Sequence, residues 1–576
     1  MKVPLILALS CAMTCSVFAQ SQDGQTKPKA PHKGSAKSVF PNEIQELKDA
    51  VAAQQQQIQQ LQQQISTRDQ AIQQLQNEVK NIPTPPAPPA PTDYGSDINA
   101  LQGDVKDLKS QDVNMADSLT ETQKRIGDLE SPTSIHYKGM TITPGGFLAG
   151  ETVWRQRATL GDINTPFNGI PFSAAGQARQ TEFYGSGRQS RLALLFQGKT
   201  TNVTLGGYFE MDFLSAGVTS NNNQSNSYTM RQRQAYASAA FQSGWTLTAG
   251  QMWSLVTETR KGLDNRTEAT PLQIDAQYVA GFSWDRGYGF RVSKNFNNKL
   301  WAGISIENSQ EIVTAHGNPT NFLLGGPGTG GGLYNPTANY SSNLSPDYVG
   351  KLHFEPGFGT YEVFAVGSLL RERIYPNAPT NASGAFNNTT YGIGFGANAR
   401  WLFAKKKVET GLHFLGGNGI GRYGSSGLPD ATVDGSGQLH PLRSYQANAE
   451  LDLHFPKWDW YFDGGGEYVG DWSTLLKGKP VGYGSPYFVN TGCGTETLPT
   501  AANGYGPGPL ASCTGDTRAI IEGTAGFWYK PYNGPKGRLQ MGLQYSYLTR
   551  DTWKGINGKP EAIDNMIFSS FRYYLP

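Results

Sequence analysis

The chain has 576 residues, and only 16% of them are charged, against about 25% in an ordinary soluble domain. Its 48 Lys and Arg residues exceed its 46 Asp and Glu residues by two, so the composition gives no sign of bulk attraction to nucleic acid or to an anionic surface. After the N-terminal leader, no apolar run reaches the roughly 18 residues that a membrane-spanning helix needs. A helical membrane protein is therefore excluded, whereas a transmembrane β-barrel is not, because its strands alternate polar and apolar residues.

Residues 1–19 have the pattern of a secretory signal peptide. Lys2 is followed by an apolar stretch, and the small residue Ala19 precedes the expected cleavage site. Two alternatives stay open, namely a short buried N-terminal helix and a lipoprotein cysteine at Cys11 or Cys15. The pattern predicts export from the cytoplasm.

The cysteines fit an exported protein. Two of the four leave with the leader, so the mature chain keeps Cys493 and Cys513. In an oxidising compartment this pair can close a loop of about 20 residues, which is worth roughly 3 kcal/mol through the entropy of the unfolded chain. We expect a disulfide, because the surrounding segment offers too few further ligands for a metal site.

Residues 44–80 carry a heptad repeat. Ile or Val recurs at every seventh residue, and Leu occupies many of the second core positions. This repeat predicts a coiled coil and so an oligomer contact, whereas the polar Gln54 and Arg68 at core positions leave the number of helices open. The polar residues 20–43 before it are expected to be disordered.

Residues 81–96 are rich in proline, and a second heptad repeat follows over residues 97–131. The proline-rich segment predicts a stiff polyproline linker, and the repeat predicts a second coiled coil. At 1.5 Å per residue, each coil would reach on the order of 50 Å. The N-terminal part is therefore suited to spanning a distance.

From residue 132 to the end at 576, the hydrophobic pattern changes to a period of two. Short turns alternate with long polar loops throughout this region, which is typical of an outer-membrane barrel with tight periplasmic turns and long external loops. The fold class predicted is an all-β transmembrane β-barrel of 16 antiparallel strands, preceded by the α-helical coiled coil. The sixteen candidate strands begin near Gly145, Gln189, Val203, Thr229, Trp245, Gly287, Leu300, Asp347, Gly359, Thr389, Lys406, Leu442, Trp458, Thr517, Gly537 and Asp564.

Several candidate strands have one apolar face and one polar face. Phe209 alternates with Glu210, for example, and Leu543 with Gln544. In a soluble barrel the apolar face would point inward, but this chain has too few charged residues to cover a wetted exterior. We therefore expect the apolar faces to contact lipid and the polar faces to enclose water.

The order of these parts resembles that of the DcaP-like trimeric porins. The resemblance extends from the coiled coil to the end of the chain and includes the motifs ITPGGF over 142–147 and LTAGQMWS over 247–254. It implies a homotrimer in the outer membrane, in contact with its lipid and lipopolysaccharide, with the coiled coil in the periplasm. It also implies a pore in each subunit, narrowed by an inward loop, that passes small anionic solutes such as dicarboxylates.

A structural role is the alternative, in which the barrel anchors the coiled coil as a periplasmic spacer to the peptidoglycan of the cell wall. A third reading is an exported, soluble, β-rich carbohydrate binder. Solubility without detergent would support that third reading.

Charged residues that face the predicted water-filled interior are the candidate site, since arginines there would guide carboxylates through bidentate hydrogen bonds. The alternative for each arginine is a solvated side chain or an ion pair that stiffens the barrel. The third long loop, over residues 255–286, is the candidate constriction. The predicted pore-lining residues are Arg191, Arg231, Arg233, Arg291, Arg400 and Arg538, with Glu210, Asp212, Asp459 and Asp463 among the opposing acidic residues; the constriction loop carries Glu258, Arg260, Lys261, Asp264, Arg266 and Arg286.

The sequence does not predict catalysis or a cofactor. Its 7 histidines show no metal-ligand spacing, and no Gly-x-Ser-x-Gly elbow occurs. His413 is expected to face inward, where it could act as a lone acid or base, but an outer-membrane hydrolase would need a serine partner beside it. Tryptophans near strand ends are interpreted as an interfacial girdle, and these are Trp245, Trp253, Trp401, Trp458 and Trp460.

Overall fold

The computed structural model describes scattered residues between 63 and 77, and residues 134–576 except 215–228, 276, 318–320, 325–340 and 499–509. The chain divides into two compact units, residues 1–116 and 117–576. The described residues between 63 and 77 have helical backbone. The predicted signal peptide, the proline-rich linker, the second coiled coil and most of the first lie outside the described residues.

No helix in the described part of the chain is both long and apolar enough to cross a membrane.

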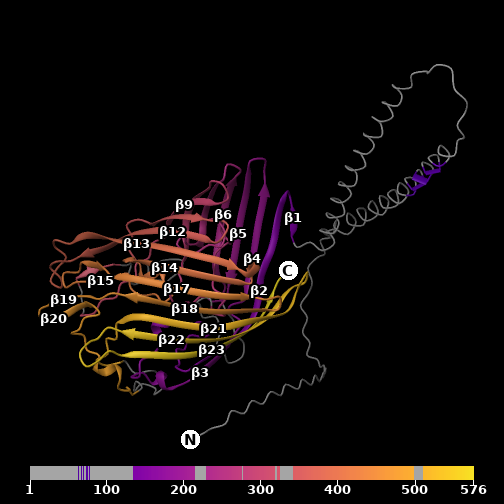
Figure 1. Ribbon diagram of the computed structural model, residues 1–576. Coiled ribbons are helices and arrows are strands. Elements are labelled where there is room, and N and C mark those ends of the chain that lie inside the picture. The colour runs from indigo at the N-terminus through magenta and orange to yellow at the C-terminus, as the bar shows by residue number, and fades with distance from the viewer. Residues whose placement is uncertain are drawn as a thin grey trace, which may run out of the picture. The chain divides into compact units, whose positions relative to one another are not determined.

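In the described part of the second unit, sixteen antiparallel strands close into a barrel (Figure 1), which confirms the predicted barrel. The barrel closes because the first strand pairs with both its sequence neighbour and the last strand, so that Phe147 lies opposite Arg191 and opposite Tyr574. The second strand is interrupted and consists of β3 and β4. The strands are β2 (Met140–Arg155), β3 (Glu182–Ser186) with β4 (Arg191–Lys199), β5 (Val203–Asp212), β6 (Arg231–Phe241), β7 (Trp245–Trp253), β8 (Arg286–Asn295), β9 (Leu300–Glu307), β11 (Asp347–Phe354), β12 (Thr360–Ile374), β13 (Phe386–Phe403), β14 (Val408–Asn418), β17 (Arg443–His454), β18 (Trp458–Val469), β21 (Thr517–Gly534), β22 (Gly537–Thr552) and β23 (Glu561–Tyr574).

Smaller elements extend the barrel or lie in its loops. Two short strands add to the ends of barrel strands, β1 (Ile135–Tyr137) to β2 and β10 (Phe322–Leu323) to β12. Two hairpins lie in the long loops: β15 (Ala431–Val433) with β16 (Leu439–Pro441), and β19 (Trp472–Leu476) with β20 (Lys479–Tyr483). The 3₁₀ helices are η1 (Phe167–Gly169), η2 (Gly176–Arg179), η3 (Ala404–Lys406), η4 (Gly421–Tyr423) and η5 (Thr491–Cys493).

The connections between barrel strands differ in length at the two ends of the barrel. Because successive antiparallel strands reverse direction, every second connection lies at the same end. The short connections are 200–202, 242–244, 296–299, 355–359, 404–407, 455–457 and 535–536, and longer loops join the strands at the other end. The predicted disulfide between Cys493 and Cys513 is present in one of these long loops.

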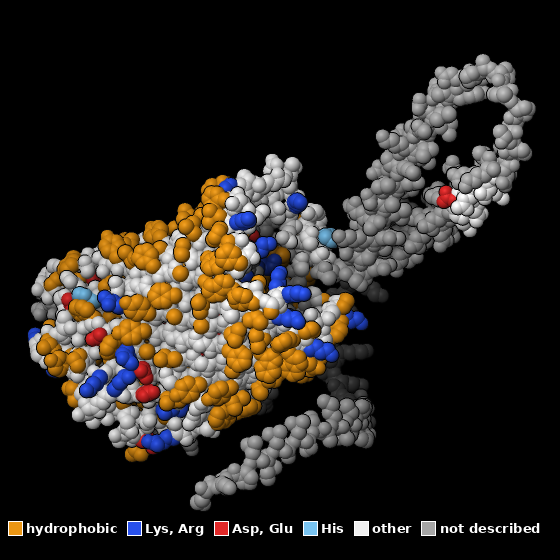
Figure 2. All heavy atoms as spheres, viewed as in Figure 1, with side chains coloured by type: hydrophobic (Ala, Val, Ile, Leu, Met, Phe, Trp, Pro, Cys, Tyr) orange, Lys and Arg blue, Asp and Glu red, His pale blue; other side chains and the backbone are white. Residues whose placement is uncertain are grey.

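The barrel wall is inverted relative to that of a soluble protein. On β22, Leu543 is 46% exposed, whereas its neighbour Gln544 is only 2% exposed. The same alternation occurs on β13, where Phe395 is exposed and Asn398 is buried. Hydrophobic side chains accordingly cover much of the visible wall in Figure 2. The apolar faces of the strands therefore point outward and the polar faces inward, as the charge content of the sequence predicts.

Exposed aromatic side chains gather near the short connections. Trp458 contacts the ring of Tyr529, with ring centroids 4.6 Å apart, close to the connection 455–457. An aromatic band at one end of an apolar wall is typical of the boundary between lipid and water. Others near the short connections are Trp245, Phe296, Phe358, Phe403 and Trp460.

Candidate functional site

The long connection between β7 and β8, residues 254–285, contacts strands far from its own position in the sheet. Its backbone N–H groups donate to buried side chains: Ile274 to Oε1 of Gln544 at 2.6 Å, and Ala280 to Oε2 of Glu522 at 2.9 Å. Trp528 on β21 donates its indole N–H to the carbonyl of Leu272 at 2.8 Å. Polar groups of β21 and β22 therefore satisfy the backbone of this loop.

Gly281 marks the closest approach of this loop to the wall. Its φ of 82° lies in the region that favours glycine. A Cβ atom at this position would lie 1.9 Å from the carbonyl oxygen of Ala447 on β17. Its backbone N–H donates to Oε1 of Glu467 at 3.1 Å. Only glycine therefore fits between the loop and the wall here.

Asp275 fastens the same loop to the first long connection. Its carboxylate accepts hydrogen bonds from the side-chain amide of Asn164 at 2.6 Å and from the backbone N–H of Thr165 at 3.1 Å. Burial raises the pKa of Asp275 to about 7, although the hydrogen bonds from Thr165 and Asn164 and the nearby Arg155 lower it. The carboxyl group is therefore largely neutral in acidic solution.

Arg400 joins the loop to a second part of the wall. Its Nε donates to Oε1 of Glu258 at 2.7 Å, its Nη2 to Oε2 of Glu450 at 2.8 Å, and its Nη1 to Oε1 of Glu409 at 2.7 Å. Arg260 of the loop also pairs with Glu409. Arg400 therefore lies in a closed ion-pair network between β13, β14, β17 and the loop.

A cavity of about 490 Å³ lies beside the loop on the polar side of strands β4, β5, β6, β22 and β23. Its lining combines basic, acidic and aromatic side chains. The charged residues that line it are Arg191, Arg233, Arg266, Arg538 and Arg572, with Glu210, Asp212, Glu268 and Asp459.

Part of this lining is a set of ion pairs between β5 and β6. Arg233 donates its Nε to Oε1 of Glu210 and its Nη1 to Oδ2 of Asp212, both at 2.7 Å. Arg231 also pairs with Asp212, at 2.8 Å. These contacts hold Arg233 and both carboxylates in place.

Other guanidinium groups near the cavity keep free donors. The buried Nε atoms of Arg191 and Arg538, and the buried Nε and Nη1 of Arg286, have no hydrogen-bond partner among the described residues. Arg538 stacks over the ring of Tyr574 at 4.0 Å, and Arg286 over that of Trp284 at 4.4 Å. Donors that are held in place but unsatisfied suit the capture of a carboxylate.

The structure divides the sequence-predicted residues into groups. Arg191, Arg233, Arg538, Glu210, Asp212, Asp459 and Arg266 line the cavity. Arg400, Glu258 and Arg260 belong to the ion-pair network around Arg400. Arg291 is buried and donates to the carbonyl of Trp253 at 2.6 Å. Asp463 is buried on β18 with both carboxylate oxygens lacking a hydrogen-bond partner among the described residues, and Lys261 and Asp264 are exposed.

The structure shows one cavity residue that the sequence did not predict and corrects the interpretation of another. Arg572 on the last strand lines the cavity and donates its Nε to Oε1 of Glu151 at 2.8 Å. Its signal is the alternation of β23, in which it shares a buried face with Ser570. The girdle interpretation is wrong for Trp253, which is buried beside the cavity and stacks under Arg286 at 5.0 Å.

His413 has a serine of the loop 254–285 beside it. Its Nε2 lies 2.8 Å from Oγ of Ser283 in the loop, and its Nδ1 contacts Oδ1 of Asn398 at 2.5 Å. All three side chains are buried. These contacts fasten the end of the loop to β14.

No protein-family model matches the chain, and no curated protein matches it. Among solved structures, the chain is similar to OmpF of Salmonella typhi in complex with daunomycin, with 10% identity, a TM-score of 0.40, and coverage of 77% of this chain and 100% of that one. It is also similar to an anion-selective porin from Comamonas acidovorans, with 10% identity, a TM-score of 0.40, and coverage of 76% and 100%.

The likeness to the outer membrane channel DcaP of Acinetobacter baumannii has a TM-score of 0.50 at 15% identity. It covers 77% of this chain and 99% of that one. At this level of identity the likeness concerns the fold. The predicted resemblance is therefore confirmed for the fold: the barrel of this chain has the fold of the channel DcaP.

Proposed function

We propose that the protein is an outer-membrane porin for passive diffusion of small hydrophilic solutes, with a preference for anions such as dicarboxylates. The observation that carries this proposal is the inverted barrel, with an apolar outer wall around a polar interior. An apolar wall with an aromatic band suits a bilayer, and a sixteen-stranded barrel is wide enough for a water-filled lumen.

In this proposal the loop 254–285 narrows the lumen, and the solute passes the arginine-lined cavity. Its hydrogen bonds to β21 and β22 support that position. The free donors of Arg191, Arg286 and Arg538 support the preference for anions, because a carboxylate can accept from them without breaking an existing ion pair. The paired Arg233, in contrast, fixes the position of the acidic residues.

The proposed assembly is a homotrimer, with the N-terminal coiled coil in the periplasm and the barrel in contact with outer-membrane lipid and lipopolysaccharide. The heptad repeat of residues 44–80 supports an oligomer. The resemblance to trimeric porins supports three copies. Native mass spectrometry of the detergent-solubilised protein tests the copy number.

Reversal potentials across a planar bilayer under a salt gradient test the preference for anions. We expect the wild-type channel to prefer anions, and the double variant Arg191→Gln/Arg538→Gln to shift toward cations, because it removes two positive charges from the lining of the cavity. Lys299→Gln is the matched control, since it removes an exposed charge in the connection 296–299. A wild-type preference for cations contradicts the anion proposal, and a barrel without conductance contradicts the porin proposal.

A further inference from the structure

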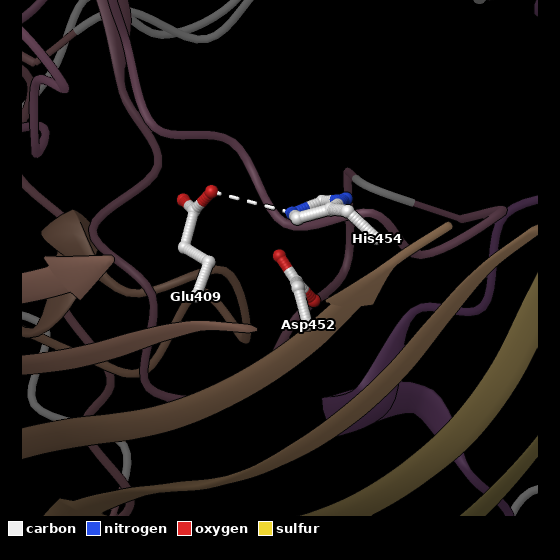
Figure 3. A group of neighbouring side chains, drawn as sticks. All are labelled: Glu409, Asp452 and His454. Atoms are coloured by element: carbon white, nitrogen blue, oxygen red, sulfur yellow. Dashed lines mark ion pairs between the residues drawn. The ribbon is translucent and has the colours of Figure 1, made fainter. Parts of the chain in front are cut away.

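Three potential metal ligands converge on the inner wall near the short connection 455–457. They are Glu409 on β14 and Asp452 and His454 on β17 (Figure 3). One ligand atom of each lies within 4.8 Å of the other two. The sheet register causes this convergence, because Glu409 pairs directly with Asp452, and His454 lies two residues further along the same face. The three side chains are thus positioned by the ladder rather than by a loop.

Asp452 lacks the partner that its position demands. Its side chain is 1% exposed, and neither carboxylate oxygen has a hydrogen-bond partner among the described residues. Figure 3 shows the carboxylate directed into the space between Glu409 and His454. A buried, unpaired carboxylate is costly, and a second acidic residue directly opposite in the ladder adds repulsion. This arrangement points to a cation between the three side chains.

His454 is oriented as a metal ligand is. Its Nδ1 lies 3.0 Å from Oδ1 of Asp459, and its Nε2 faces Oε2 of Glu409 at 3.4 Å. A carboxylate that accepts from one ring nitrogen commonly fixes the tautomer of a histidine whose other nitrogen binds a metal. Lys530 in turn holds Asp459, with its Nζ 2.9 Å from Oδ1. Asp459 and Lys530 therefore already hold the His454 ring in the orientation that such a site needs.

Glu409 keeps one oxygen for a ligand. Arg400 donates to Oε1 at 2.7 Å, and Arg260 contacts the same oxygen. Oε2 is left to face His454. The contacts of the two guanidinium groups fix the geometry of Glu409. Their positive charge also weakens the attraction of the cluster for a cation.

We propose that Oε2 of Glu409, one oxygen of Asp452 and Nε2 of His454 bind a first-row divalent cation, with Zn²⁺ as the test ion and water completing the coordination. One imidazole and two carboxylates suit such an ion, whereas Mg²⁺ and Ca²⁺ favour oxygen ligands throughout. To bring each ligand atom to about 2 Å from one shared ion, these side chains need only a small movement toward one another.

Calorimetric titration of the chelator-treated full chain in detergent with Zn²⁺ alone tests this proposal. We expect one ion per chain in the wild type, and binding at least ten-fold weaker in Asp452→Asn and in His454→Gln. Mg²⁺ and Ca²⁺ should also bind at least ten-fold more weakly to the wild type. His440→Gln is the matched control, because His440 is a half-buried histidine that also pairs with a carboxylate, that of Asp434 at 3.4 Å. It should bind Zn²⁺ as the wild type does.

A further variant separates a metal site from a network of ion pairs. Arg260→Gln removes a positive charge from Glu409, so we expect it to tighten Zn²⁺ binding several-fold. Absence of binding to the wild type, or equal binding by the wild type and His454→Gln, would overturn the proposal. In either case His454 acts only as a charged partner of Glu409 and Asp459. The titration requires no conductance, so its outcome is independent of the proposed porin function.

Discussion

Arg400 and Arg538 show how differently two arginines on inward faces can be used. Arg400 donates to three carboxylates and is fully enclosed, whereas Arg538 stacks on Tyr574 and keeps a buried donor without a partner among the described residues. Removing one partner from a buried ion pair typically costs about 3–5 kcal/mol, so Arg400 is expected to serve the stability of the barrel. The alternation of each strand predicts that both residues face inward. It cannot predict which of them is neutralised, because Glu258 reaches Arg400 from a loop more than a hundred residues earlier in the chain.

The carboxyl group of Asp275 makes stability depend on pH. Burial raises its pKa from 3.8 to about 7, so the folded chain holds a proton that the unfolded chain has released in this range. Its contribution to stability is full below pH about 4, falls as the pH rises, and is lost once the pH passes about 7. The Asp275→Asn variant should lack this dependence. Urea midpoints of both proteins between pH 4 and 8 measure it, and a constant difference between the two would contradict the assignment.

At the scale of elements, the sixteen strands begin close to the positions that the alternation predicts, because an apolar outer face and a largely polar inner face impose a period of two. The path of the loop 254–285 follows from no such period. It depends on contacts such as Ile274 with Gln544, between residues that are far apart in sequence. The convergence of Glu409 and Asp452 likewise needs the register of β14 against β17, which the strand pattern leaves open.

The fit of Gly281 against β17 makes the loop sensitive to one methyl group. We expect Gly281→Ala to destabilise the protein by about 1–3 kcal/mol, because the added Cβ would clash with the Ala447 carbonyl and the backbone has a positive φ. Thermal unfolding in detergent measures the loss, and single-channel recording should show a larger or noisier conductance.

Gly287→Ala is the control for this prediction. Nothing lies within 4 Å of a Cβ at Gly287, and its φ is not positive, so both stability and conductance should stay at the wild-type level. An equal loss of stability in the two variants would show that the close contact with Ala447 is unimportant.

At the scale of the whole molecule, the closed barrel does not need the N-terminal segments for its wall. The first barrel strand begins at Met140 and pairs with the last strand. A chain without residues 20–131 should therefore retain single-channel conductance, while any attachment to the cell wall through the coiled coil should fail. Bilayer recordings and co-sedimentation with peptidoglycan measure the two properties separately. Loss of conductance on deletion would show that the barrel depends on the coiled coil.

The alternation of the barrel wall has a consequence for how such a chain travels before it folds. The machinery that inserts a growing polypeptide into a lipid bilayer recognises long, uninterrupted apolar segments. In this wall polar and small side chains recur within each strand, so no strand offers such a segment, and the continuous apolar surface forms only when neighbouring strands pair. The unfolded barrel segment therefore contains no stretch that would hold it in a bilayer before its strands pair.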